Sequence, residues 1–269
     1  MNKYVFLFLV LFITFSSALP IQVTTIESEY RLPNVISQPL IKLLGETCYV
    51  SLLEEFHLTD VPCVKLAISK GLGLGIVVGG AIVKIPQIIT IIRHGSAKGL
   101  SLTSFLLETT AYEIVLMYNT RQNNPFSTYG EVLFMTVQNI LICLLIVNYE
   151  SNNKKMIGII ILGFASGIFF LFMIPSWMMA LLYAAQIPIG LASKIPQIRI
   201  NYINRSTGQL SVFAVLNYFA GTTARAFTTW TELDDPVMLG GNLLASVLNG
   251  ILVFQLVIYW DTRTLPKAD

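Results

Sequence analysis

One five-residue motif, Lys-Ile-Pro-Gln-Ile, occurs twice in this chain, at residues 84–88 and again at residues 194–198. When the sequence is aligned with itself at this offset, residues 80–149 match residues 190–259 without a gap, and 16 of the 70 positions are identical. That identity is well above the level that so apolar a composition produces by chance, and it indicates an internal duplication. A duplicated chain is expected to fold into two similar units, so the repeat constrains the fold more than any other feature.

The composition identifies the environment in which these two units fold. Hydrophobic residues make up 54% of the chain and charged residues only 12%. Soluble domains carry about a quarter charged residues, so we predict an integral membrane protein. The net charge of +2 is small, and no cluster of Lys and Arg with interleaved aromatic residues is present, which argues against a nucleic-acid partner.

Seven apolar stretches have about the 20 residues that are needed to cross a hydrocarbon core. They cover residues 70–92, 100–118, 129–148, 156–174, 177–203, 210–230 and 238–260. The repeat relates the first three stretches to the last three and leaves the fourth without a counterpart. Three crossings place the ends of a unit on opposite sides, and one extra crossing returns the chain to its starting side. We therefore predict an all-α membrane protein in which a linker helix joins two parallel three-helix bundles, a 3+1+3 architecture.

The first residues predict how the chain is targeted. Residues 1–19 combine Lys3, an apolar run and the small residues Ser16-Ser17-Ala18, which is typical of a signal peptide; an uncleaved anchor is the alternative. Basic residues in the short loops gather on one side: Arg93, Lys98, Lys154, Lys155, Arg199, Arg205, Arg263 and Lys267. The positive-inside rule makes that side cytosolic and the opposite side lumenal.

These signals divide the chain into six parts. We expect a signal peptide (1–19), a lumenal N-terminal segment (20–69), the first repeat (70–149), the linker helix (156–174), the second repeat (177–260) and a cytosolic tail (261–269).

The cysteines suggest a covalent link in the N-terminal segment. Cys48 and Cys63 both lie in the part that this orientation exposes to an oxidising lumen. A disulfide between them and two free thiols are both open at this stage. Cys143 falls in the middle of the third stretch. None of the three shows the CxxC or Cys/His spacing of a zinc site, so no metal is expected.

Prolines interrupt the apolar stretches at equivalent places. A proline inside a helix removes one backbone donor and frees the carbonyl four residues earlier. Pro86 and Pro196 do this in the two copies of the motif, and Pro188 adds a further break in the fifth stretch. We interpret all three as hinges on which the two bundles rock against each other.

Polar side chains near these hinges are candidates for ligand binding. Lys84 and Gln87 in the first copy correspond to Lys194 and Gln197 in the second. Two lysines that face each other across the repeat axis suit an anionic group such as a phosphate. The alternative is that both lysines extend to the cytosolic surface and anchor their helices.

Two further polar residues occupy equivalent positions in the third stretch of each repeat. Asn139 and Asn249 either line the same cavity or bridge neighbouring helices.

Three charged residues lie at membrane depth outside the motif. Because an isolated charge there costs several kcal/mol, Glu108, Glu113 and Arg225 are expected to face the interior and to pair. By depth, Glu113 is the better partner for Arg225. A structural role and a ligand role for this pair are both open.

No catalytic signature accompanies these features. The sequence contains no nucleophile elbow, no HExxH motif and no Walker motif. We therefore expect a protein that is not an enzyme and that needs no cofactor.

The doubled Lys-Ile-Pro-Gln-Ile in a 3+1+3 chain resembles the PQ-loop repeat family, which includes SWEET sugar transporters and lysosomal amino-acid exporters. Further segments resemble the branch of that family that is needed for using dolichol-phosphate-mannose and dolichol-phosphate-glucose as lumenal sugar donors. They are Val61–Lys65, Ser69–Val77, Ser96–Ser101, Thr207–Ser211, Ala224–Thr228 and Asn249–Gly250.

The resemblance implies an endoplasmic-reticulum membrane protein with dolichyl-phosphate sugars as partners. The cavity between the repeats would bind or reorient the head of the lipid. Two other readings are open: a SWEET-like transporter of small solutes or sugars, and a scaffold for lumenal glycosyltransferases.

Overall fold

The computed structural model describes residues 32–98, 100–151, 154–192, 194–207 and 212–260. Every regular element in these ranges is helical, as the sequence predicts. The helices are α2 (Asn34–Leu44), α3 (Glu46–Tyr49), α4 (Val61–Ile82), α5 (Ile85–His94), α6 (Leu102–Arg121), α7 (Gly130–Ile146), α8 (Lys154–Met173), α9 (Ser176–Ala192), α10 (Lys194–Asn204), α11 (Val212–Glu232) and α12 (Pro236–Ile258). Short helical turns η1 (Val50–Glu54), η2 (Phe126–Thr128) and η3 (Val147–Ser151) complete the set. The expected signal peptide and tail lie outside the described residues.

Five helical segments within the described ranges are long and apolar enough to cross a membrane: Val61–His94, Gly130–Glu150, Lys155–Met173, Ser176–Asn204 and Pro236–Ile258. The sequence led us to expect seven. The other two expected crossings correspond to α6 and α11, which have 20 and 21 residues and so have the length of a span. They are less apolar because they carry many of the polar side chains described below.

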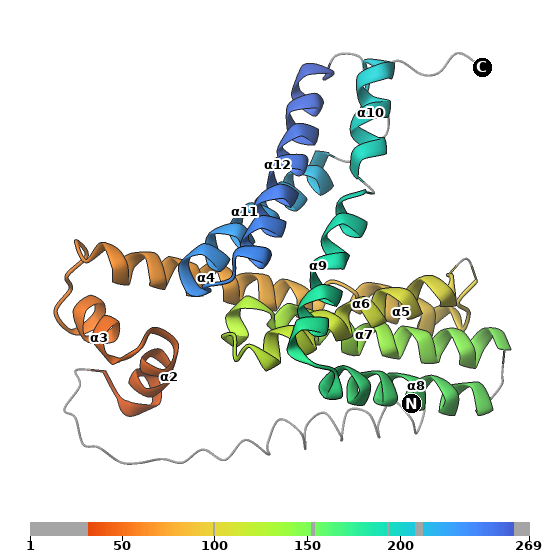
Figure 1. The fold of residues 1–269 in the computed structure, drawn as a ribbon, viewed down its shortest axis with the longest axis horizontal. Helices are drawn as coiled ribbons and strands as arrows, with labels where there is room; N and C mark the ends of the chain where they lie inside the picture. Colours follow the sequence, from red (N-terminus) through yellow and green to blue (C-terminus); the bar gives the residue numbers. More distant parts are fainter. Residues whose placement is uncertain (1–31, 99, 152–153, 193, 208–211, 261–269) are drawn as a thin grey trace.

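The two repeats exchange contacts in a symmetrical way. The first repeat comprises α4 to α7, the second comprises α9 to α12, and α8 connects them. The first helix of each repeat packs against the second helix of the other, α4 against α11 and α9 against α6. In Figure 1, α4 to α8 run along the long axis of the molecule, whereas α10 and α12 stand at a steep angle to them. The repeats therefore meet along two helix pairs, α4 with α11 and α6 with α9.

The start of the first membrane segment differs from the prediction. Helix α4 begins at Val61, whereas the apolar pattern predicted a start at residue 70. The side chain of Asp60 caps the helix by accepting a hydrogen bond from the backbone N–H of Cys63, and Pro62 occupies the first turn, where its missing N–H is not needed. The sequence Asp60-Val61-Pro62 favours the start of a helix, but a prediction from hydropathy alone does not detect it.

A disulfide joins the N-terminal helices to the bundle. Cys48 in α3 and Cys63 in α4 are linked, with their Cα atoms 5.1 Å apart. Gly45, which has a φ of 80°, separates α2 from α3, because glycine enters this region of backbone space without steric penalty. Cys143 is a free, buried thiol.

The first copy of the motif coincides with a change of helix. Helix α4 ends at Ile82 and α5 begins at Ile85, just before Pro86. In the second copy, α9 is described to Ala192 and α10 from Lys194, and the residue between them lies outside the described ranges. Pro188, by contrast, lies inside α9 without ending it.

A glutamine fills the break in the first repeat. In a continuous helix the N–H of Lys84 would donate to the carbonyl of Gly80. Instead, Gln138 of α7 accepts from the Lys84 N–H at 2.9 Å and donates to the Gly80 carbonyl at 2.8 Å. Its amide thus satisfies this pair of groups and also donates to the Ala81 carbonyl at 3.1 Å, which reduces the number of unpaired backbone groups in the membrane. Leu248 occupies the equivalent position in the second repeat, and its apolar side chain cannot form such a bridge.

Candidate functional site

A polar cluster surrounds the first helix break. The Lys84 ammonium lies 2.7 Å from Oε2 of Glu108 and donates to Oδ1 of Asn139 at 2.5 Å. Asn139 donates in turn to Glu108 at 2.9 Å, and the Tyr112 hydroxyl donates to the other Glu108 oxygen at 2.7 Å. The charges of lysine and glutamate therefore neutralise each other inside a network that uses every polar group of the two side chains.

The second repeat places a related cluster at the same positions. Lys194, Tyr218, Thr222 and Asn249 correspond to Lys84, Glu108, Tyr112 and Asn139. The Lys194 ammonium lies 5.2 Å from the centre of the Tyr218 ring. Asn249 donates to the Tyr218 carbonyl at 3.3 Å and to the Thr222 hydroxyl at 3.1 Å. Four of the six predicted ligand-binding residues, the two lysines and the two asparagines, thus occur in matching clusters, one in each repeat.

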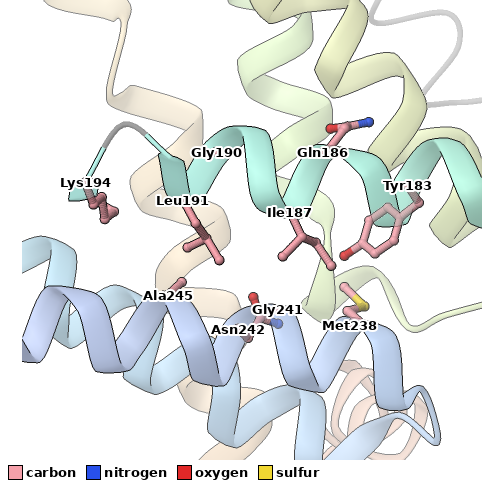
Figure 2. A pocket seen from close by; sticks show the side chains of 10 residues that line it. All are labelled: Tyr183, Gln186, Ile187, Gly190, Leu191, Lys194, Met238, Gly241, Asn242 and Ala245. Atoms are coloured by element: carbon pink, nitrogen blue, oxygen red, sulfur yellow. The ribbon is translucent and has the colours of Figure 1, made fainter. Parts of the chain in front are cut away.

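A cavity of about 240 Å³ opens beside the second cluster, between α9 and α12. Figure 2 shows Tyr183, Ile187 and Leu191 pointing from α9 toward α12, and Lys194 lies at the end of this row. Asn242 points toward them from α12.

Glycines line this cavity at positions where the first repeat has a close contact. In the first repeat, Gly80 packs directly against Glu131, so closely that a Cβ at Gly80 would overlap the glutamate. The equivalent residues in the second repeat are Gly190 and Gly241, and both line the cavity. Replacement of glutamate by glycine removes the side chain that fills this space in the first repeat.

The other two predicted ligand residues behave differently from each other. Gln197 donates to Asn201 at 2.8 Å, and Asn201 donates to Gln255 at 3.1 Å. Gln255 donates to the backbone carbonyl of Ile198 at 2.9 Å. Gln87 makes no side-chain hydrogen bond with the described residues.

The polar chain around Gln197 has no counterpart in the first repeat. Ile91 and Leu145 occupy the positions equivalent to Asn201 and Gln255, and both belong to an apolar core. This end of the bundle is therefore polar in one repeat and apolar in the other.

The predicted pair between Arg225 and Glu113 is wrong. Arg225 of α11 pairs with Glu131 of α7, with 2.5 Å between the charged atoms, and donates to the backbone carbonyl of Ser127 at 3.1 Å. The depth argument treated α6 as the neighbour of α11, but α11 packs against α4 and η2, and Arg225 reaches Glu131 at the start of α7.

Glu113 is instead buried against the linker helix. It is 3% exposed, and one carboxyl oxygen lies 3.0 Å from the point where a Cβ on Gly167 of α8 would be. The other oxygen has no hydrogen-bond partner among the described residues. A Cβ at position 167 would make an unusually tight contact with this carboxyl group, so glycine fits best here.

A second ion pair, not anticipated from the sequence, connects the repeats near Arg225. Lys70 of α4 donates to Glu232 at the end of α11 at 2.7 Å. Ser69 donates to the same carboxylate at 2.6 Å and Ser127 at 3.0 Å. Charged residues inside or beside apolar stretches could have indicated buried ion pairs. The sequence alone, however, does not say which helices face each other and so which charges pair.

Taken as a fold and a site, these features define a membrane protein built from two helical repeats, each with a lysine–asparagine cluster at its Lys-Ile-Pro-Gln-Ile motif. Comparison with known proteins makes this class specific. The PQ loop repeat family profile matches residues 68–128 and 178–238, which are offset by the same 110 residues as the motif. The chain is therefore similar to PQ-loop repeat proteins in both copies of its duplicated unit. It is 28% identical over 191 residues to solute carrier family 66 member 3 of Homo sapiens, covering 70% of this chain and 92% of that protein.

Proposed function

We propose that this protein serves the dolichol-linked sugar pathway of the endoplasmic reticulum. It would bind the phosphosugar head of dolichol-phosphate-mannose, or of the glucose form, and make it available as a lumenal donor without catalysing a reaction. The observation that carries the proposal is the pair of matching lysine–asparagine clusters at the two copies of the motif. The resemblance of several segments to the mannose-P-dolichol utilisation defect protein supplies the identity of the ligand.

The physical need for such a protein follows from the ligand. A phosphosugar head has to pass about 30 Å of hydrocarbon, and each unpaired polar group there costs several kcal/mol. Lysine, asparagine and glutamine side chains offer substitute partners, and helix breaks free backbone groups to do the same. Hinges at Pro86 and Pro196 would let the repeats move around a bound head.

We extend the proposal to the arrangement in the membrane. Seven helices cross it, with α6 and α11 as the two more polar crossings. The N-terminal segment is lumenal and the C-terminus cytosolic. The Cys48–Cys63 disulfide supports this orientation, because disulfides persist in the oxidising lumen and are rare in the cytosol.

A carrier of small solutes or sugars is the second candidate. It is favoured by the homology to a protein named as a solute carrier and by the size of the cavity, about 240 Å³. A free solute would use the same clusters but would not need a path for a lipid chain.

The test compares lumenal mannose transfer in membranes from cells with and without this protein. Deficient membranes should contain dolichol-phosphate-mannose and active mannosyltransferases, yet transfer mannose poorly while intact. Dissolving them in detergent should restore transfer to the level of control membranes, since donor and enzyme then meet freely. If transfer stays low in detergent with donor and enzymes present, the access model fails and a scaffold for glycosyltransferases replaces it.

A further inference from the structure

The matching clusters differ at one position that changes their charge. Glu108 in the first repeat corresponds to Tyr218 in the second. Lys84 is therefore neutralised by a carboxylate at 2.7 Å, whereas Lys194 has no carboxylate partner among the described residues. The cluster around Lys84 is therefore neutral, whereas the cluster around Lys194 carries a positive charge.

An unpaired ammonium is unfavourable at this place in the chain. Lys194 is half-buried and lies within the apolar segment Ser176–Asn204. Its contact with the Tyr218 ring is a cation–π attraction, which offsets only part of the loss of water around the charge. Intramembrane lysines without a partner in the protein are typical of ligand or ion pathways. Lys194 consequently lacks the anion that Lys84 already has.

The space for such an anion adjoins Lys194. The cavity between α9 and α12 includes Lys194 in its wall, and the space beside Gly190 is open, with no atom within 4 Å of a Cβ built there (Figure 2). Tyr183, Gln186 and Asn242 are the other polar residues of a mostly apolar lining. At about 240 Å³ the cavity is smaller than the 300–1,000 Å³ usual for a whole drug-sized ligand, so it suits the head of a larger molecule or a small solute.

We propose that Lys194 and the cavity between α9 and α12 form an anion site for a phosphate ester, and that Lys84 does not take part. The phosphate would bind the Lys194 ammonium, and the group esterified to it would occupy the cavity. The inference rests on the proposed function only for the source of the phosphate. If the protein binds dolichyl-phosphate sugars, the phosphate belongs to a lipid head. If it is a carrier of small solutes, the phosphate belongs to a free sugar phosphate.

The test measures binding to the purified full-length protein in a neutral detergent. The probes are farnesyl phosphate for the lipid source, mannose 1-phosphate for the free source and farnesol as the uncharged control. At least one phosphate should bind, and farnesol should bind at least about tenfold more weakly than farnesyl phosphate if the lipid is the source. Lys194→Met should weaken phosphate binding at least about tenfold, because it removes a charge-assisted contact.

Two further variants separate the anion site from loss of folding. Tyr218→Glu supplies Lys194 with the carboxylate that Lys84 has, and it should weaken phosphate binding while keeping the ammonium. Gly190→Leu should fill the cavity, because no atom lies within 4 Å of a Cβ built there. Gly240→Leu has equally open space but does not line the cavity, and it should bind as the wild type does.

The outcomes distinguish this inference from the proposed function. Binding of mannose 1-phosphate alone, lost in Lys194→Met, supports the site and removes the lipid as its source. Binding of farnesyl phosphate that is lost in Lys194→Met supports both. Equal phosphate binding by the wild type, Lys194→Met and Tyr218→Glu overturns the inference, as does the absence of any phosphate binding to folded wild-type protein.

Discussion

Removal of Glu232 tests the contact between the repeats. The Glu232 side chain is 1% exposed, and that of its partner Lys70 is 11% exposed, at 2.7 Å. Ser69 and Ser127 also donate to the carboxylate, so Glu232→Leu leaves three buried donors without their acceptor. Breaking a buried pair by removal of one partner costs about 3–5 kcal/mol. For a chain of this size, 1 kcal/mol shifts Tm by roughly 2–4 °C, so the variant should lose about 6–20 °C.

The assay is thermal unfolding of purified variants in one detergent. A double variant, Glu232→Leu with Lys70→Met, replaces both charges and should recover part of the loss, because no buried charge is then left alone. Glu55→Gln is the matched control: its pair with His57 is 64% and 55% exposed, and its removal should cost less than about 1 kcal/mol. If Glu232→Leu unfolds within about 2 °C of the wild type, or the double variant is less stable than Glu232→Leu, the reasoning about this interface is refuted.

Three further outcomes check the covalent structure, the topology and the hinges. Cys48→Ser should lower the free energy of unfolding by about 3 kcal/mol, because the disulfide closes a 15-residue loop, and reduction of the wild type should give the same loss; equal stability of oxidised and reduced protein would contradict this. Asn204, in the chain's one Asn-x-Ser/Thr sequon, should carry no glycan under the proposed topology, which makes its loop cytosolic; a glycosidase-sensitive mass shift at Asn204 would invert the topology. Pro86→Ala and Pro196→Ala should each leave Tm unchanged or raised and lower activity in a complementation assay; full activity of both would exclude the hinges.

The repeat itself made much of the site predictable. An offset of 110 residues pairs Lys84 with Lys194 and Asn139 with Asn249 without any knowledge of the fold. Equivalent residues of a duplicated unit occupy equivalent places, so finding a lysine and an asparagine together in one repeat implied the same for the other. The helical class and the PQ-loop repeats followed from the same alignment and from the apolar composition.

Contacts between the repeats were not predictable in this way. The partner of Arg225 depends on how α11 packs against α4 and η2, and neither periodicity nor depth in the membrane determines which helices become neighbours. Gln138 was missed for a related reason. Its role arises only because α7 passes beside the break after Ile82, and a glutamine in an apolar stretch gives no sign of which backbone groups it satisfies.

The central claim, that the protein binds a dolichyl-phosphate sugar, is tested most directly by mass spectrometry of lipids that co-purify with it from endoplasmic-reticulum membranes. Wild-type protein should carry dolichol-phosphate-mannose or dolichol-phosphate-glucose enriched over the bulk membrane lipids, and Lys194→Met purified in parallel should carry far less. Wild-type protein that holds these lipids in no greater proportion than the surrounding membrane does would contradict the account.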